Sequence, residues 1–208
     1  MSEVIKIANC SGFYGDNLSI AKKMVEGGPI DVLTGDYLAE LTMTILYNQK
    51  MKRGENLGYV GTFLKQFRDV AKLCNDQNIK IVSNAGGLNP ASMAAEVENI
   101  IKELNLDLKV AYIDGDDLMP RLDELSSSGE KLKNIDKNND LFSYEKKPLT
   151  ANAYLGAWGI KEALANGADV VICPRVTDAA VVIGPAAWKF NWSRNDYDQL
   201  AGALAAGH

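Results

Sequence analysis

Short runs of apolar residues, rich in valine and isoleucine, recur along the chain at regular intervals. They cover residues 4–8, 30–33, 79–83, 108–113 and 169–173. Each run has the length and composition of a β-strand buried on both faces. Between them, apolar residues at three-to-four spacing predict helices at residues 18–25, 37–50, 60–74, 91–104, 118–125 and 154–166. Strands alternating with helices predict an α/β fold with a mostly parallel sheet, flanking helices and Rossmann-like layering.

Local signals for helix ends agree with this pattern. Pro90 follows the turn-forming Asn89, where a first helical turn is expected to begin. Asp36 and Asp178 are expected to cap the segments that follow them. Gly167 suits the end of the helix that precedes the last predicted strand.

Two segments depart from the regular alternation. Residues 126–150 are rich in serine, lysine, asparagine and aspartate, which predicts a polar surface excursion. A long loop is favoured there over a functional lid. Residues 196–206 resemble the opening of a further helix with small apolar side chains, so either the chain is a fragment or a partner covers this helix. We expect one α/β domain over residues 1–208 that is the N-terminal part of a longer domain.

The composition is that of a packed intracellular protein. Of 208 residues, 47% are hydrophobic and 24% charged, which is far from the balance of a disordered chain. The net charge is −5 and the basic residues are scattered, which argues against a nucleic-acid partner. No signal peptide or membrane-spanning apolar run is recognisable, so we expect a cytoplasmic protein without a membrane partner.

Cysteine and histidine usage narrows the chemistry. The three cysteines Cys10, Cys74 and Cys173 show no C-x-x-C spacing, so neither a disulfide framework nor a thiolate metal site is predicted. We expect all three to be core residues. The single histidine is His208, so proton transfer within this chain must use aspartate, glutamate, tyrosine or lysine.

Candidate binding residues follow the predicted strands, because ligands of parallel α/β sheets bind beyond the carboxyl ends of the strands. After the first strand, Gly12 and Gly15 allow close approach of a ligand to the backbone, and Asp16 precedes a helix. This loop suits an anionic group, although a simple turn is equally open. It lacks both G-x-G-x-x-G and a Walker lysine, so there is no nicotinamide fingerprint.

Two further loops are the favoured anion contacts. Asn84, Gly86 and Gly87 precede a helix, and adjacent glycines can leave backbone N–H groups free for a phosphate or carboxylate. A bare turn is the alternative. Arg175 follows the last strand, and its planar fork suits an anion, although it can equally pair with Asp178.

Acidic residues after the strands are candidates for acid/base chemistry. Asp36 has Glu40 one helical turn later, and the pair can accept protons or hold a metal. Asp114, Asp116 and Asp117 suit Mg²⁺, which is a candidate cofactor, but their spacing is not that of an EF-hand, and turn formation or helix capping is favoured. The catalytic residues stay unassigned, and the candidates are Asp36, Asp116 and Asp178.

Four stretches, in this order, resemble the acyclic terpene utilisation AtuA-like family. They are GFYGD at 12–16, DVLTGDYLAELT at 31–42, NAGGLNP at 84–90 and GADVVICPRVTDA at 167–179. Members of the family are typically longer, which implies that more of the domain follows residue 208. Cys173 and Pro174 stand where the family pattern has Thr-Gly, which puts that loop in doubt.

The resemblance implies a role in the breakdown of citronellol- and geraniol-like compounds, alongside acyl-CoA carboxylation enzymes. It carries over no agreed catalytic residues. We expect a protein of acyclic terpenoid or branched acyl-CoA catabolism that binds an anionic small molecule, an acyl-CoA being one candidate. The alternative is a non-catalytic subunit or scaffold, docking a partner chain or a second copy through the apolar helix at residues 200–206.

Overall fold

The computed structural model describes residues 4–208, which form one five-stranded sheet in the order β1-β2-β3-β5-β4. All four strand pairings are parallel. The sheet and its flanking helices confirm the predicted α/β layering. The strands are β1 (Ile7–Asn9), β2 (Val32–Gly35), β3 (Lys80–Ser83), β4 (Val110–Tyr112) and β5 (Val170–Ile172).

Eight α-helices and two short 3₁₀ helices surround this sheet within the described residues. The α-helices are α1 (Ile20–Glu26), α2 (Glu40–Arg53), α3 (Gly61–Gln77), α4 (Pro90–Glu103), α5 (Leu122–Ser127), α6 (Trp158–Ala165), α7 (Ala180–Lys189) and α8 (Tyr197–Gly207). The 3₁₀ helices are η1 (Met119–Arg121) and η2 (Leu141–Ser143). In the part of the chain that the structure describes, no helix is long and apolar enough to cross a membrane.

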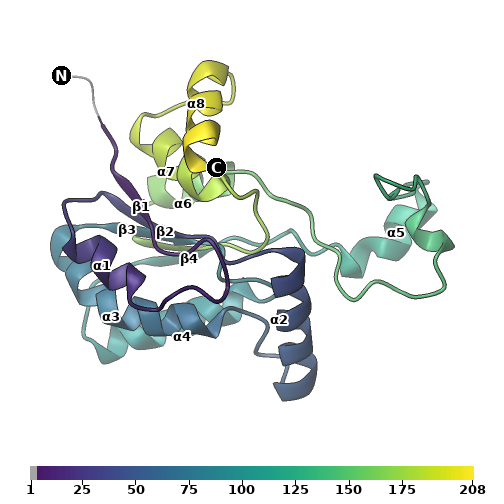
Figure 1. Ribbon diagram of the computed structural model, residues 1–208, viewed down its shortest axis with the longest axis horizontal. Coiled ribbons are helices and arrows are strands. Elements are labelled where there is room, and N and C mark those ends of the chain that lie inside the picture. The colour runs from purple at the N-terminus through teal and green to yellow at the C-terminus, as the bar shows by residue number, and fades with distance from the viewer. Residues whose placement is uncertain (1–3) are drawn as a thin grey trace.

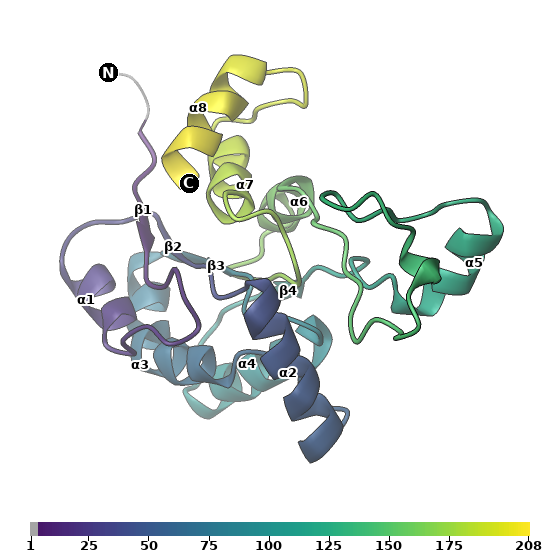
Figure 2. The ribbon, with the colours of Figure 1, turned by 45° about the vertical axis from the view of Figure 1, so that its right-hand side comes forward.

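The strand order determines which face each helix covers. The steps from β1 to β2, β3 and β4 run in one direction across the sheet, whereas β5 inserts back between β3 and β4. Because crossovers between parallel strands are right-handed, this reversal places the helix before β5 on the opposite face. Figures 1 and 2 show α1, α3 and α4 on one side of the sheet and α6, α7 and α8 on the other. The chain therefore crosses the sheet from β1 to β4 and then turns back to form β5, which lies between β3 and β4.

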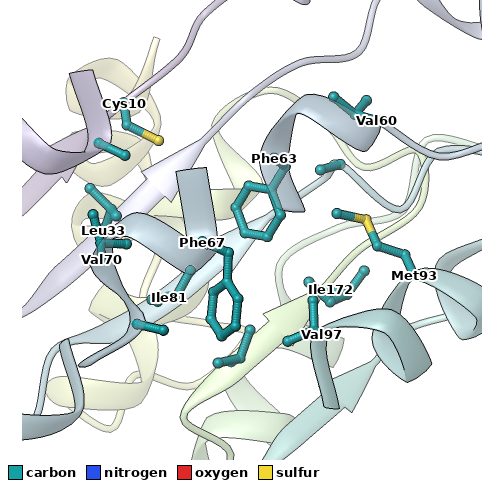
Figure 3. Packing of buried hydrophobic residues seen from close by; sticks show 14 of the residues in the cluster. Cys10, Leu33, Val60, Phe63, Phe67, Val70, Ile81, Met93, Val97 and Ile172 are labelled. Carbon is teal, nitrogen blue, oxygen red and sulfur yellow. The ribbon is translucent and has the colours of Figure 1, made fainter. Parts of the chain in front are cut away.

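The face under α3 and α4 is filled by large side chains (Figure 3). Phe63 and Phe67 of α3 stack with their ring centroids 6.2 Å apart. They belong to one buried cluster with Ile81 and Ile172 of the sheet and Met93 of α4. Burial of aromatic and branched side chains on this scale is the main source of stability in such a layer. Cys10 and Cys74 are buried in the same cluster, as expected, and Cys173 is buried in the cluster on the opposite face.

The opposite face is filled mostly by valine and alanine, with Ile160 and Leu164 of α6 as its larger buried side chains. Val32, Val82 and Val171 pack against α6 and α7. Gly184 lets the two helices approach, because a Cβ there would lie 2.5 Å from Cγ2 of Ile160. Helix α8 packs on α7, and Ala203 is its one buried residue within the described chain.

Two of the expected helix caps are confirmed, and two are wrong. Asn89 caps α4 by accepting a hydrogen bond from the Ser92 N–H, and Pro90 is the first helical residue. Gly167 follows α6 with a positive φ of 87°. Asp36 does not cap a helix, because α2 begins only at Glu40 after an extended stretch. Asp178 does not cap α7 either, and both carboxylates make other contacts described below.

Residues 118–151, here called the arm, leave the body of the molecule and return to the same place. Figures 1 and 2 show α5 and its neighbouring loops extending away from the sheet. Most side chains of residues 126–150 are exposed, as predicted for a polar excursion. The base is closed by a bridge between Asp117 and Asn152 and by a 2.7 Å hydrogen bond from Leu118 N to Ala151 O. The arm is therefore an insertion whose two ends meet.

Candidate functional site

A cavity of about 660 Å³ lies between the sheet and the helices α7 and α8. Its polar end is formed by residues at the carboxyl ends of three strands, namely Asn9, Gly12, Thr34, Asp36 and Asp178. Its walls are mostly apolar and include Ile5, Ile7, Val181, Val182, Ala186, Phe190, Trp192, Ala203 and Ala206. An apolar body with a few polar groups at one end is the usual form of a small-molecule site.

Strand alternation explains why this end of the cavity is polar. Ile7 pairs with Val32 and Asn9 with Thr34, so each pair shares a face of the sheet. Because side chains alternate between faces, Asn9 and Thr34 point to the same side as the apolar residues that precede them by two positions. The Thr34 hydroxyl lies 3.3 Å from Oδ1 of Asn9. A side-chain amide from Asn9 and a hydroxyl from Thr34 therefore lie at the carboxyl ends of β1 and β2.

Asp36 is held by the buried amide of Asn84. Asn84 is fully buried, its Oδ1 accepts from the Tyr37 N–H at 2.8 Å, and its Nδ2 donates to Oδ1 of Asp36 at 2.5 Å. Burial raises the pKa of the Asp36 carboxyl, and the nearby charge of Asp178 acts in the same direction, while the Asn84 hydrogen bond opposes them. Asp36 therefore keeps its proton to a higher pH than an ordinary aspartate.

Arg175 is buried and committed to protein groups. Its Nη1 donates to Leu38 O at 2.9 Å and to Oδ1 of Asp178 at 3.3 Å. Its guanidinium carbon lies 4.0 Å from the centre of the Tyr154 ring, and its Nη2 is 3.9 Å from Oε1 of Glu40. The geometry thus agrees with the alternative in which Arg175 pairs with Asp178. The predicted anion contact of Arg175 is not observed directly and stays a prediction.

Glu40 and Tyr154 complete this side of the site. The Tyr154 hydroxyl donates to Oε1 of Glu40, and this bond lowers the pKa of the glutamate. Glu40 faces Tyr154 and Arg175, whereas Asp36 is bound to Asn84. The two carboxylates expected to act as a pair therefore have different partners.

Asp116 is hydrogen-bonded to two other parts of the protein. It is buried, and its Oδ2 accepts from Nδ2 of Asn152 at 2.8 Å and from the Arg175 N–H at 3.2 Å. Burial raises the pKa of this carboxyl. Asp116 does not line the cavity, and it joins the base of the arm to the loop after β5. Its neighbour Asp117 accepts from the Met119 N–H at the start of η1, which is the expected turn role.

Gly86 and Gly87 allow the loop after β3 to pack closely. A Cβ on Gly86 would lie 2.6 Å from Cys173 O, and one on Gly87 would lie 2.4 Å from Cδ1 of Leu46. Gly87 also has a positive φ of 54°. The N–H of Gly86 donates to Cys173 O and that of Gly87 to Asn84 O. This geometry agrees with the turn alternative. Both N–H groups donate to protein carbonyls, so neither is free for the predicted anion contact.

The loop after β1 is closed by its own carboxylate. Oδ2 of Asp16 accepts from the Gly12 N–H at 2.8 Å and lies 3.4 Å from the Ser11 hydroxyl. Gly15 leaves room for the ring of Phe13, because a Cβ there would lie 2.7 Å from that ring. Of the three predicted residues in this loop, Gly12 alone lines the cavity.

Two carboxyl groups line the polar end of the cavity, and one of them, that of Asp178, is paired with Arg175. Asp36 and Asp178 line it, and no lysine or arginine of residues 4–208 does so, while His208 lies among the lining residues. Carboxyl groups disfavour an anion and form hydrogen bonds with a hydroxyl or other neutral polar group. Across those same residues, no three acidic, histidine or cysteine side chains are grouped to hold a metal ion.

Sequence reasoning missed part of this site. Asn9 and Thr34 belong to strands, and the alternation of each strand would have placed them on one face. Tyr154 was assigned to a predicted helix, whereas α6 begins only at Trp158, and Asn152 lay between the predicted excursion and that helix. The walls from α7 and α8 had no counterpart among the candidate residues, because α7 was not predicted.

The fold defines a class, the α/β proteins in which helices cover both faces of a parallel sheet. Within that class, the chain belongs to the family described as acyclic terpene utilisation family protein AtuA, whose model matches residues 5–208. This confirms the resemblance inferred from the four loop motifs. No curated protein and no solved structure matches the chain.

Proposed function

We propose that this protein acts in the catabolism of acyclic terpenoids or related branched acyl compounds, binding the hydrocarbon chain of its substrate in the cavity. The observation that carries this proposal is the joining of apolar walls to a polar end at the carboxyl ends of the strands. The family membership supports it independently. The substrate's oxygen-bearing end lies beside Asp36 and Asp178 in this arrangement.

The walls suit a branched chain of modest length. A volume of about 660 Å³ is within the roughly 300–1,000 Å³ of small-molecule sites. Isoprenoid chains carry methyl branches, and Ile7, Val181 and Val182 present branched side chains of the same kind. Dispersion contacts between such groups, together with removal of apolar surface from water, supply the affinity.

The polar end favours a neutral oxygen group over a free carboxylate. A protonated Asp36 donates a hydrogen bond to a hydroxyl or a thioester carbonyl, and in its ionised form it accepts a proton. Asn9 and Thr34 supply further hydrogen bonds. An alcohol or the carbonyl of an acyl-CoA therefore fits better than a free acid, and the charged part of a coenzyme A thioester lies outside the cavity. We assign Asp36 as the acid/base candidate.

Binding measurements with a cavity-filling variant test this proposal. Gly202 lines the cavity and a Cβ there meets no atom within 4 Å, so we expect Gly202→Leu to occupy part of the cavity. We expect isothermal titration calorimetry to show roughly tenfold or greater loss of affinity for geraniol or its coenzyme A thioester relative. Ala205→Leu, on the same helix but outside the cavity, is the matched control and keeps the affinity of the unmodified protein.

Two results would contradict the proposal. One is the absence of binding of branched alcohols and thioesters to the unmodified protein. The other is equal binding by the Gly202→Leu variant. A separate comparison addresses catalysis: Asp36→Asn is expected to retain binding and to abolish any turnover of the bound compound.

A second candidate function is that of a non-catalytic subunit, which the exposure of α8 favours. Tyr197 is 70% exposed and Leu204 is 52% exposed, although both are large apolar side chains on a helix that contacts mainly α7. Docking of a partner chain or a second copy would cover them. Sedimentation at micromolar concentration tests this. A monomer whose behaviour does not change in Leu204→Glu argues against it.

A further inference from the structure

A second concave surface lies outside the cavity, between α6 and the segment that joins α7 to α8. It has a volume of about 490 Å³ and is lined by Trp158, Gly159, Lys161, Glu162, Ser193 and Arg194. Two cations converge on one indole in it: Nζ of Lys161 is 5.6 Å and the guanidinium carbon of Arg194 is 5.0 Å from the centre of the Trp158 ring. We call this surface the basic pocket.

Neither cation of the basic pocket has a carboxylate partner. Within residues 4–208, no carboxylate oxygen lies within 4.0 Å of Lys161 or Arg194. Glu162 also lines the basic pocket, and its carboxylate accepts from Nδ2 of Asn166 rather than from either cation, while Asp196 accepts from the Ser193 N–H. Nζ of Lys161 donates to Trp192 O at 2.5 Å, a neutral acceptor.

This arrangement leaves positive charge in excess, because two cations and one carboxylate, that of Glu162, line the basic pocket. Two like charges close to one ring repel each other, and the repulsion is stronger for the half-buried Lys161 than for a fully solvated lysine. The contacts with Trp158 hold both cations in place. In a chain whose net charge is −5, a local pair of this kind attracts an anion that the rest of the surface repels.

We infer that the basic pocket binds a phosphate group. The guanidinium of Arg194 offers paired donors that match phosphate oxygens, and the ammonium of Lys161 adds a point charge. The Ser193 hydroxyl lies on the same surface and is a further donor. A phosphate dianion is favoured over a monoanionic carboxylate because two cations face it.

Neighbouring residues in the sequence line the cavity and the basic pocket. Phe190 and Trp192 line the cavity, whereas Ser193 and Arg194 line the basic pocket. A phosphate bound here has two sources, a free inorganic phosphate or the phosphorylated carrier of a coenzyme A thioester. The second source rests on the proposed function, whereas the phosphate site itself does not.

Titrations with pyrophosphate, inorganic phosphate and coenzyme A test this inference. Calorimetry gives the affinities, and tryptophan fluorescence reports directly because Trp158 is part of the pocket. We expect Arg194→Gln and Lys161→Met each to weaken pyrophosphate binding by roughly tenfold or more. Lys23→Met, an equal change of charge on the exposed surface of α1, is the matched control and leaves the affinity unchanged.

The outcomes separate the two proposals. Failure of the unmodified protein to bind phosphate and pyrophosphate at millimolar concentration overturns the inference, and so does unchanged binding by Arg194→Gln. Arg194 is exposed and makes no hydrogen bond within the described chain, so this variant keeps its fold even if Lys161→Met does not. If Arg194→Gln weakens coenzyme A as well, the carrier is the source. If it weakens phosphate alone, the site stands with free phosphate as its ligand. Pyrophosphate binding that persists in Gly202→Leu shows that the basic pocket does not depend on the cavity.

Discussion

The face of the sheet under α3 and α4 and the face under α7 and α8 differ in the size of the side chains that fill them. The first is occupied by stacked phenylalanines with methionine and isoleucine, and the second mostly by valine and alanine, with Ile160 and Leu164 and a cavity beside β1. The same strands supply both faces, because alternate residues point in opposite directions.

The difference shows where the molecule gains stability and where it keeps room for a ligand. A close-packed layer gains free energy from every buried methylene, whereas the lining of a cavity loses those contacts. The polar groups lie at the edge of the cavity side, where Asp36 and Asp178 remain accessible. If this comparison is right, equivalent substitutions on the two faces will have unequal effects.

The largest expected effect is truncation of an aromatic side chain in the closed layer. Phe67→Ala should lower the free energy of unfolding by about 3–5 kcal/mol, since the ring is buried and stacked on Phe63. Val182→Ala, on the cavity wall, should lower it by about 1 kcal/mol or less because the wall already faces empty space. Urea unfolding measures both. Equal losses would show that the two faces are packed alike.

A smaller effect is expected from substituting glycines on the two sides of the site. Gly87→Ala should destabilise the protein by about 2 kcal/mol, because its φ is positive and the new Cβ would meet Leu46 and Gly58 O. Gly12→Ala, which meets nothing within 4 Å, should change stability by no more than about 0.5 kcal/mol. Thermal unfolding of the two variants gives the comparison. A stable Gly87→Ala variant would refute the packing role of that glycine.

The smallest effect concerns pH. Burial holds the folded-state pKa of Asp36 above its ordinary value of 3.8, so the folded protein keeps a proton that the unfolded chain releases. The resulting stabilisation is fully present below pH 3.8 and is lost as the pH rises through the folded-state pKa. Asp36→Asn lacks this loss, so its melting temperature should rise relative to that of the unmodified protein between acidic and neutral pH. If the melting temperatures of the two proteins change in parallel with pH across that interval, folding does not raise the pKa of Asp36. Asp116 is present in both proteins and cancels in the difference.

The layering of the fold could be predicted because periodicity reports burial. All five strands overlap the predicted apolar runs, since strands buried on both faces are continuously apolar. Helix α7 was missed because AVVIGPAAWK has few polar positions to mark an exposed face and contains Pro185. The stretch before α2 was assigned to a helix, but Leu38 O accepts from Arg175, a contact between residues distant in the sequence.

The position of the site could be predicted only to the edge of the sheet. Strand ends identify that edge, and Asp36, Asn84, Arg175 and Asp178 do meet there. Which N–H groups remain free is decided by tertiary packing, as Gly86 shows by donating to Cys173 O on another strand. No local pattern could have placed Tyr154 over Arg175, because the two residues are brought together by the bridge between Leu155 and Val176.

Because the two ends of the arm meet at its base, the number of residues in the arm does not affect the rest of the fold. The bridge between Asp117 and Asn152 joins these ends, so the arm connects to the sheet as a short turn would, whatever its sequence. The entropy of closing a loop grows only slowly with its length. The arm is therefore a place where chain can be lengthened, shortened or exchanged for another module, and where proteases can cut, without changing the register of the strands that hold the site.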